Sequence, residues 1–153
     1  MKVVLVEDSP LIRKQLLGTL KEQPFISVVG LAATEAEALC TVGLTRPHVV
    51  VLDLGLASGS GLAVLRQLRQ AGFGGTILVL SNREAELYEP LCLQNGANAF
   101  YDKGREFERF LADLNMLAEA PRLAASRPMA LTSLLMPDRP GTAGGIGSNS
   151  SAA

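Results

Sequence analysis

Runs of apolar residues alternate with helix-like stretches along most of the chain. The most uniform run is Val49–Leu52, which is apolar throughout and stops at Asp53. An apolar run without polar alternation is typical of a strand buried on both faces of a parallel sheet. Further apolar runs predict strands at residues 3–6, 25–31, 76–80 and 97–101.

Helix signals lie between these strands. Ser9 and Pro10 suit the N-cap and the first position of a helix, and Ile12, Leu16 and Leu20 follow at four-residue spacing. Residues 34–37 read Thr-Glu-Ala-Glu, a capping box that predicts a second helix to about residue 44. Apolar spacing predicts three more helices, near residues 62–71, 83–94 and 107–120. Because Pro90 falls inside the fourth of these helices, we expect a kink or a late start there.

Strand and helix alternate five times, which predicts an α/β fold whose parallel sheet is covered by helices on both sides. The expected fold is a three-layer, flavodoxin-like, doubly wound (βα)5 domain with strand order 2-1-3-4-5. We expect this domain to cover residues 1–120. The composition then changes to proline, glycine and serine, so residues 121–153 are expected to form a flexible, disordered tail.

The composition limits the cellular compartments and the classes of binding partner that we expect for this chain. The chain has 153 residues, of which 48% are hydrophobic and 19% charged, as in one globular domain. The net charge of −1 provides no bulk attraction to nucleic acid or to an anionic membrane, so neither is an expected partner. Cys40 and Cys92 match no metal-binding or redox spacing. These features favour a reduced, cytoplasmic setting.

Polar residues follow the ends of several predicted strands. Glu7 and Asp8 follow the first strand and Asp53 the third, while Ser81 follows the fourth and Lys103 the fifth. In open parallel sheets, ligands bind beyond the carboxyl ends of the strands, and the predicted order makes the first and third strands neighbours. We therefore expect the three carboxylates to lie close together.

Three carboxylates and one ammonium carry a formal charge of about −2 when all are ionised. Mg²⁺ relieves such a cluster because it takes oxygen ligands and combines a few carboxylates with phosphate oxygens. The backbone carbonyl of Gly55 is a further candidate ligand. The carboxylate of Asp53 is itself a candidate nucleophile that can form an aspartyl phosphate.

Four segments in order resemble the receiver domain of bacterial response regulators, the phospho-accepting part of two-component signalling. The matching segments are Val4–Asp8, Val50–Leu54 with Gly61-Leu62 downstream, Leu78–Ser81 and Gly96–Lys103. The resemblance covers residues 1 to about 119 and is to a single-domain, chemotaxis-regulator-like receiver. It implies a phosphorylation switch and not an enzyme with its own substrate.

The resemblance also implies roles for individual residues. Asp53 accepts a phosphoryl group from a histidine kinase or a histidine phosphotransfer protein, and Lys103 and Ser81 interact with that group. Glu7, Asp8, Asp53 and the Gly55 carbonyl hold Mg²⁺. Ser81 and Phe100 act as switch residues, and Gly55 and Arg83 tune dephosphorylation. The face built from the fourth helix, fifth strand and fifth helix would then control partner binding.

Other interpretations remain open from the residues alone. The chain could be an interaction module of the same fold that works without phosphorylation. It could also be an aspartate-nucleophile phosphohydrolase, although Gly55 stands where those enzymes carry a second acid. Asp53 could cap the next loop, Ser81 could cap the fourth helix, and Phe100 could be an ordinary core residue. His48 is interpreted as a strand-edge residue and not as a phosphohistidine.

Overall fold

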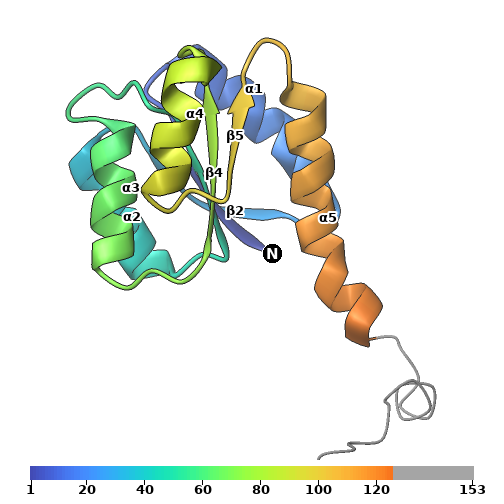
Figure 1. Cartoon of the computed structure of the whole chain (residues 1–153). Coiled ribbons are helices and arrows are strands. Elements are labelled where there is room, and N and C mark those ends of the chain that lie inside the picture. Colours follow the sequence, from blue (N-terminus) through green and yellow to red (C-terminus); the bar gives the residue numbers. More distant parts are fainter. Residues whose placement is uncertain (126–153) are drawn as a thin grey trace, which may run out of the picture. The chain divides into compact units, whose positions relative to one another are not determined.

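In the described part of the chain, residues 1–125, five parallel strands form one sheet in the order β2-β1-β3-β4-β5 (Figure 1). The structure is a computed structural model, and most of the predicted tail, residues 126–153, lies outside the described residues. The elements in chain order are β1 Lys2–Val6, α1 Pro10–Lys21, β2 Ser27–Ala32, α2 Glu35–Thr45, β3 Val49–Leu52, α3 Gly61–Gln70, β4 Thr76–Ser81, α4 Ala85–Gln94, β5 Ala99–Asp102 and α5 Phe107–Ala125. The predicted fold class and strand order are confirmed.

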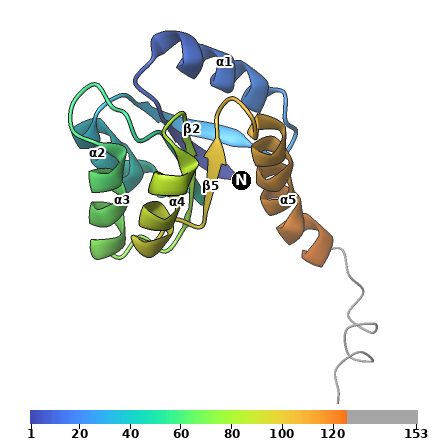
Figure 2. The same cartoon turned by 45° about the horizontal axis from the view of Figure 1, so that its top comes forward.

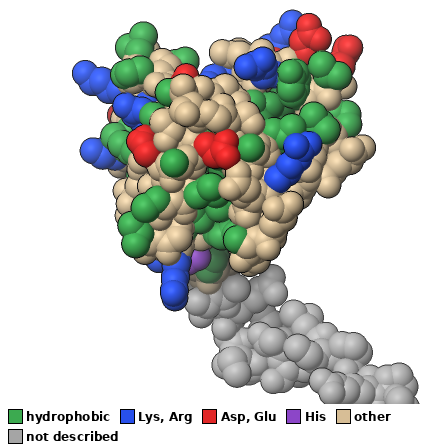
Figure 3. Space-filling view, turned by 90° about the vertical axis from the view of Figure 1, so that its left-hand side faces the viewer, with side chains coloured by type: hydrophobic (Ala, Val, Ile, Leu, Met, Phe, Trp, Pro, Cys, Tyr) green, Lys and Arg blue, Asp and Glu red, His purple; other side chains and the backbone are tan. Residues whose placement is uncertain are grey.

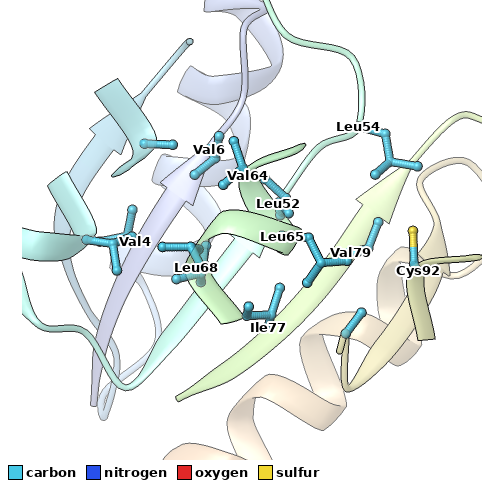
Figure 4. Close-up of a cluster of buried hydrophobic side chains, with 14 of the residues drawn as sticks. Val4, Val6, Leu52, Leu54, Val64, Leu65, Leu68, Ile77, Val79 and Cys92 are labelled. Atoms are coloured by element: carbon cyan, nitrogen blue, oxygen red, sulfur yellow. The ribbon is translucent and has the colours of Figure 1, made fainter. Parts of the chain in front are cut away.

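The sheet separates two apolar layers, because successive side chains of a strand point to opposite faces. One layer lies under α2, α3 and α4, and part of it is shown in Figure 4. The other lies under α1 and α5, which cover the opposite face in Figures 1 and 2. On β3, Val50 and Leu52 enter the first layer, while Val49 and Val51 enter the second. Burial on both faces of the sheet therefore explains why the run Val49–Leu52 is apolar throughout.

Side-chain caps begin the first two helices as predicted. Ser9 Oγ accepts a hydrogen bond from Ile12 N at 3.3 Å, and Thr34 Oγ1 accepts one from Glu37 N at 3.1 Å. In an ideal capping box the Glu37 carboxylate would accept a hydrogen bond from the backbone N–H of the N-cap residue, Thr34. Here it accepts from Ala33 N, one residue earlier. Strands β2 and β5 each begin two residues later than predicted.

Helix α4 has few local interactions that stabilise its first turns. It begins at Ala85, so the late start expected from Pro90 is observed. Its N-cap residue is Glu84, which makes no side-chain capping hydrogen bond. Pro90 has no N–H to donate to the carbonyl one turn back. Helix α4 therefore lacks two local interactions that normally fix a helix in place.

Helix α5 continues to Ala125, beyond the predicted end near residue 120. Pro121 lies inside it, so one backbone hydrogen bond of the helix is missing at that point. A proline often marks the end of a helix, but α5 continues past Pro121.

The two cysteines should differ sharply in reactivity. Cys92 is buried in the layer beneath α4, and burial raises the pKa of its thiol to about 11, whereas Cys40 is exposed. Because the thiolate is the nucleophile, we expect iodoacetamide at pH 8 to modify Cys40 and spare Cys92. Peptide mass spectrometry should show one modified cysteine in the native protein and two in denaturant. Equal labelling of both in the native protein would contradict the buried position of Cys92.

Candidate functional site

The ends of β1 and β3 bring three carboxylates together. Asp53 N donates a hydrogen bond to Val6 O at 3.0 Å, which fixes the two strand ends side by side. Carboxylate oxygens of Glu7, Asp8 and Asp53 all lie within 4.8 Å of one another. The structure thus brings these residues together at the edge where the sequence placed them.

Lys103 enters the cluster from the end of β5. Its Nζ donates to Glu7 Oε1 at 2.5 Å and lies 3.5 Å from Asp53 Oδ2. The side chains of Lys103 and Glu7 are only 11% and 2% exposed, so the ion pair is largely shielded from water. Lys103 N also donates to Ser81 O at 2.9 Å, which ties the end of β5 to that of β4. Lys103 is therefore the counter-charge for both Glu7 and Asp53.

Glu7 is held more firmly than the other two acids. Its second carboxylate oxygen accepts from Ser9 N at 3.2 Å, and its backbone carbonyl accepts from Arg13 Nη1 at 3.0 Å. Within residues 1–125, the Asp8 carboxylate has no hydrogen-bond or ion-pair partner, and the Asp53 carboxylate forms an ion pair only with Lys103. Oxygens of Asp8 and Asp53 are thus available to a ligand.

This donor set fits a hard divalent cation. Clustered carboxylate oxygens are the ligands that Mg²⁺ takes in proteins, usually with water and phosphate oxygens completing its shell. Gly55, the predicted source of a carbonyl ligand, lies in the loop after β3, where it forms an isolated antiparallel bridge with Ser60. The residues present are those that a magnesium site of this kind requires.

Ser81 and Arg83 connect the site to α4. Ser81 is fully buried, and its Oγ accepts a hydrogen bond from Arg83 N at 3.0 Å. The Arg83 guanidinium approaches Gly55, where a built Cβ would lie 3.6 Å from Nη2, and it also lies 5.9 Å from the Tyr88 ring centroid. The segment between β4 and α4 therefore runs from the site to the first turn of the helix.

Phe100 is not part of the charged cluster. It is 1% exposed and belongs to the apolar layer beneath α2, α3 and α4, together with Cys92. Its neighbour Tyr101 faces the other layer, where it donates to Asp113 Oδ2 at 2.7 Å. That burial and bond raise the pKa of the Tyr101 hydroxyl. His48 also lies outside the cluster. Its Nδ1 accepts a hydrogen bond at 2.9 Å from the N–H of Lys2, the first residue of β1, whereas the carboxylates lie beyond the other end of that strand.

Sequence reasoning assigned no structural role to Gly61, which the site needs. Gly61 N donates to Leu54 O at 2.9 Å, and a Cβ on Gly61 would lie 2.7 Å from Leu54 Cα and against the carbonyl oxygen of Asp53. The signal was present, because glycine is a poor residue for the first helical position after the N-cap Ser60. The role of Arg13 was missed too, since nothing in the sequence shows that it reaches the carbonyl of Glu7.

Replacing Gly61 by Ala should lower the free energy of unfolding by about 2 kcal/mol, because the new methyl group meets backbone and not a flexible side chain. Chemical denaturation measures this change. Gly43→Ala is the matched control, since Gly43 lies inside α2 with no atom within 4 Å of a built Cβ. That variant should be more stable by about 0.5–1 kcal/mol. Equal effects of the two variants would contradict the close approach at Gly61.

The fold and site together define a class of protein. A sheet in the order 2-1-3-4-5, with an acidic cluster and a lysine at its carboxyl edge, is the architecture of a signal receiver domain. The family profile described as "Response regulator receiver domain" matches residues 3–115. The chain belongs to this family, the receiver domains of two-component systems, and the predicted resemblance to a receiver domain is confirmed.

Relatives and solved structures agree with this assignment. The two-component response regulator PhoP of Pseudomonas aeruginosa is 37% identical over 117 residues, covering 76% of this chain and 51% of the relative. A protein-glutamate methylesterase/protein-glutamine glutaminase of Carboxydothermus hydrogenoformans is 32% identical, over 86% of this chain and 39% of the relative. The BeF3-activated receiver domain of Klebsiella pneumoniae RstA has a TM-score of 0.70 at 25% identity, covering 77% of this chain and 98% of that one.

The chain spans about half the length of the curated relatives it matches, and relatives of this kind include DNA-binding regulators as well as the methylesterase. In residues 1–125, the helices are all too short or too polar to span a bilayer.

Proposed function

We propose that the domain is a phosphorylation switch in which Asp53 accepts a phosphoryl group from a histidine kinase or a histidine phosphotransfer protein. The observation that carries this proposal is the convergence of Glu7, Asp8, Asp53 and Lys103, from separate strand ends, within ion-pair or ligand-sharing distance. Receiver domains of two-component systems receive their phosphoryl group in this way, and the chain belongs to that family.

In the proposed reaction, a carboxylate oxygen of Asp53 attacks phosphorus of a phosphohistidine. The new P–O bond forms as the P–N bond breaks, and the electron pair of the broken bond returns to the imidazole nitrogen of the donor. Lys103, already 3.5 Å from Asp53, places its positive charge beside the transferred group. Mg²⁺ bound by Glu7, Asp8, Asp53 and the Gly55 carbonyl would supply further neutralisation of charge on the phosphoryl oxygens.

The phosphoryl group then changes the contacts of Ser81. Its oxygens are strong acceptors, so the Ser81 hydroxyl and Lys103 turn towards them. The hydroxyl that now accepts from Arg83 N is drawn away, and this disturbs the start of α4. Phe100, which lies beneath α4, rotates into the space that Ser81 leaves. The face formed by α4, β5 and α5 thereby controls partner binding, and Gly55 with Arg83 sets the lifetime of the phosphorylated state.

The direct experiment is intact mass spectrometry of the full chain after incubation with acetyl phosphate. We expect one phosphoryl adduct when Mg²⁺ is present and a large reduction when EDTA replaces it. An absent adduct would support the alternative of an interaction module that works without phosphorylation.

The proposal also assigns no enzymatic activity beyond the domain's own phosphorylation and dephosphorylation. The relative named as a methylesterase is matched over only 39% of its length, so its name assigns no activity to this chain. Turnover of p-nitrophenyl phosphate is the discriminating assay. Sustained release of p-nitrophenol that depends on Asp53 would favour the phosphohydrolase alternative over a switch.

A further inference from the structure

We propose that the outward side of α4 is a docking surface for a basic, amphipathic segment of a partner protein. The inference rests on the proposed function, because α4 belongs to the face that phosphorylation is proposed to control. It adds the chemistry of the partner, which the family assignment leaves open.

The outward side of α4 is unusually apolar for a surface helix. Leu87 and Leu93 are 61% and 44% exposed, and Pro90, also exposed, lies midway between them in the sequence. At 3.6 residues per turn, Leu87 and Pro90 fall on the side of the helix opposite to the buried Cys92, and Leu93 flanks that side at about 100° from Cys92. Figures 1 and 2 show α4 at the edge of its layer, with no other helix over its outer side. The leucines are therefore available as contacts for a partner.

The charges on the same helix are of one sign. Glu84 and Glu86 are exposed at its start, Glu89 is half-buried one turn further on, and α4 contains no lysine or arginine. In the part of the chain that the structure describes, none of the three carboxylates forms a hydrogen bond or an ion pair through its side chain. An acidic surface that lacks partners of its own favours a basic ligand.

Neighbouring cations offset only part of this negative charge. Arg83 is directed towards Gly55 and the Tyr88 ring, and Arg109 pairs with Glu106 at 2.5 Å and lies 4.9 Å from the Tyr101 ring centroid. Arg105 and Arg83 line a polar hollow at the start of α4 together with Glu84, Glu86 and Asp102, so two cations face three carboxylates there and the balance stays negative. In contrast, Figure 3 shows the side formed by α2 and α3, where charges of both signs are interspersed with hydrophobic side chains.

The combination of apolar anchors and unpaired carboxylates selects the kind of partner. Nucleic acid and anionic membrane are disfavoured because their phosphates would face the carboxylates. A second copy packed α4 against α4 would place like charges opposite each other. A protein segment with leucine-like side chains on one side and lysine or arginine beside them satisfies both features, as in the docking of an amphipathic helix on a groove or face.

The test uses the full chain labelled with ¹⁵N and a helical probe peptide made of leucine on one face and lysine on the other. A leucine–glutamate peptide of the same length is the matched probe. We expect the leucine–lysine peptide to shift amide signals mainly in residues 84–94 and the leucine–glutamate peptide to leave them unchanged. Raising the salt concentration should weaken the binding, because charge attraction contributes to it.

Two variants test the two features separately, and a third controls for net charge. Glu86→Gln with Glu89→Gln, and Leu87→Ala with Leu93→Ala, should each weaken binding by roughly tenfold. Glu22→Gln with Glu37→Gln removes the same charge from exposed positions at the C-cap of α1 and in the first turn of α2, away from the face of α4, β5 and α5, and should leave the affinity within about twofold. Equal losses in the acidic pair and the control pair, or equal binding of both peptides, would overturn the docking surface.

Phosphorylation measured on the same sample separates this inference from the proposed function. If Asp53 takes up phosphate and the leucine–lysine peptide does not bind α4, the docking surface is wrong and the proposed function stands. If the peptide binds α4 and no phosphate is taken up, the docking surface stands and the proposed function fails.

Discussion

Replacing Asp53 by Asn should abolish the phosphoryl adduct formed with acetyl phosphate and Mg²⁺. The amide keeps the size and shape of the side chain, but its oxygen is a poor nucleophile and carries no charge for a cation to bind. Intact mass spectrometry of wild type and variant, treated side by side, measures the loss directly. Circular dichroism should show that the variant is folded, because Asp53 is partly exposed and its removal takes away repulsion from Glu7 and Asp8.

The matched control for this experiment is Glu108→Gln, which neutralises an exposed carboxylate in the first turn of α5. It should be phosphorylated to the same extent as the wild type. An adduct of undiminished amount on Asp53→Asn would show that another residue is the acceptor, and peptide mapping would then identify it.

Replacing Lys103 by Met should lower the free energy of unfolding by about 3 kcal/mol in the absence of Mg²⁺. Methionine has a similar length and no charge, so the carboxylate of Glu7, 2% exposed, loses its counter-charge while remaining buried. Because the same change leaves the acidic cluster with one more net negative charge, we expect Mg²⁺ to bind more tightly and to restore much of the lost stability. Urea denaturation with and without Mg²⁺ measures both effects.

Lys14→Met is the control, because Lys14 is exposed on α1 and forms no ion pair in the described residues. Its effect on stability should stay within about 0.5 kcal/mol, and it should not change the response to Mg²⁺. A Lys103→Met protein as stable as wild type without metal would contradict the role of Lys103 as counter-charge to Glu7.

The elements that the sequence predicted well are those that a periodic pattern or a local cap determines. The run Val49–Leu52 predicted a strand buried on both faces because no polar residue interrupts it, and the structure has all four residues buried. Ser9 and Thr34 predicted helix starts because their side chains act on N–H groups only three residues away. The alternation of strands and helices predicted a parallel sheet, and the strand order was predicted because 2-1-3-4-5 is a common order in sheets of this class.

The details of the site depend on distances that no local pattern encodes. The sequence placed Lys103 near the carboxylates but did not show that Glu7, 96 positions earlier, is its closest partner. It showed a glycine at position 61 but not that the backbone of Asp53 and Leu54 would lie against it. The first residue of α4 was similarly hard to predict. Pro90 and the missing side-chain cap both weaken the helix locally, so packing against the rest of the domain, and not helix propensity, decides where α4 begins.

The short segment from Phe100 to Lys103 meets several requirements at once. Phe100 and Tyr101 fill opposite layers, Asp102 pairs with Ser81 across the sheet, and the Lys103 backbone bonds to the Ser81 carbonyl before its side chain reaches Glu7. Inserting or deleting a single residue here would exchange the two aromatic rings between layers and turn the ammonium away from the acids. This stretch should therefore tolerate no change of length, whereas lengthening the loop between β3 and α3 on the side of Ala57 and Ser58, both exposed, would preserve the sheet.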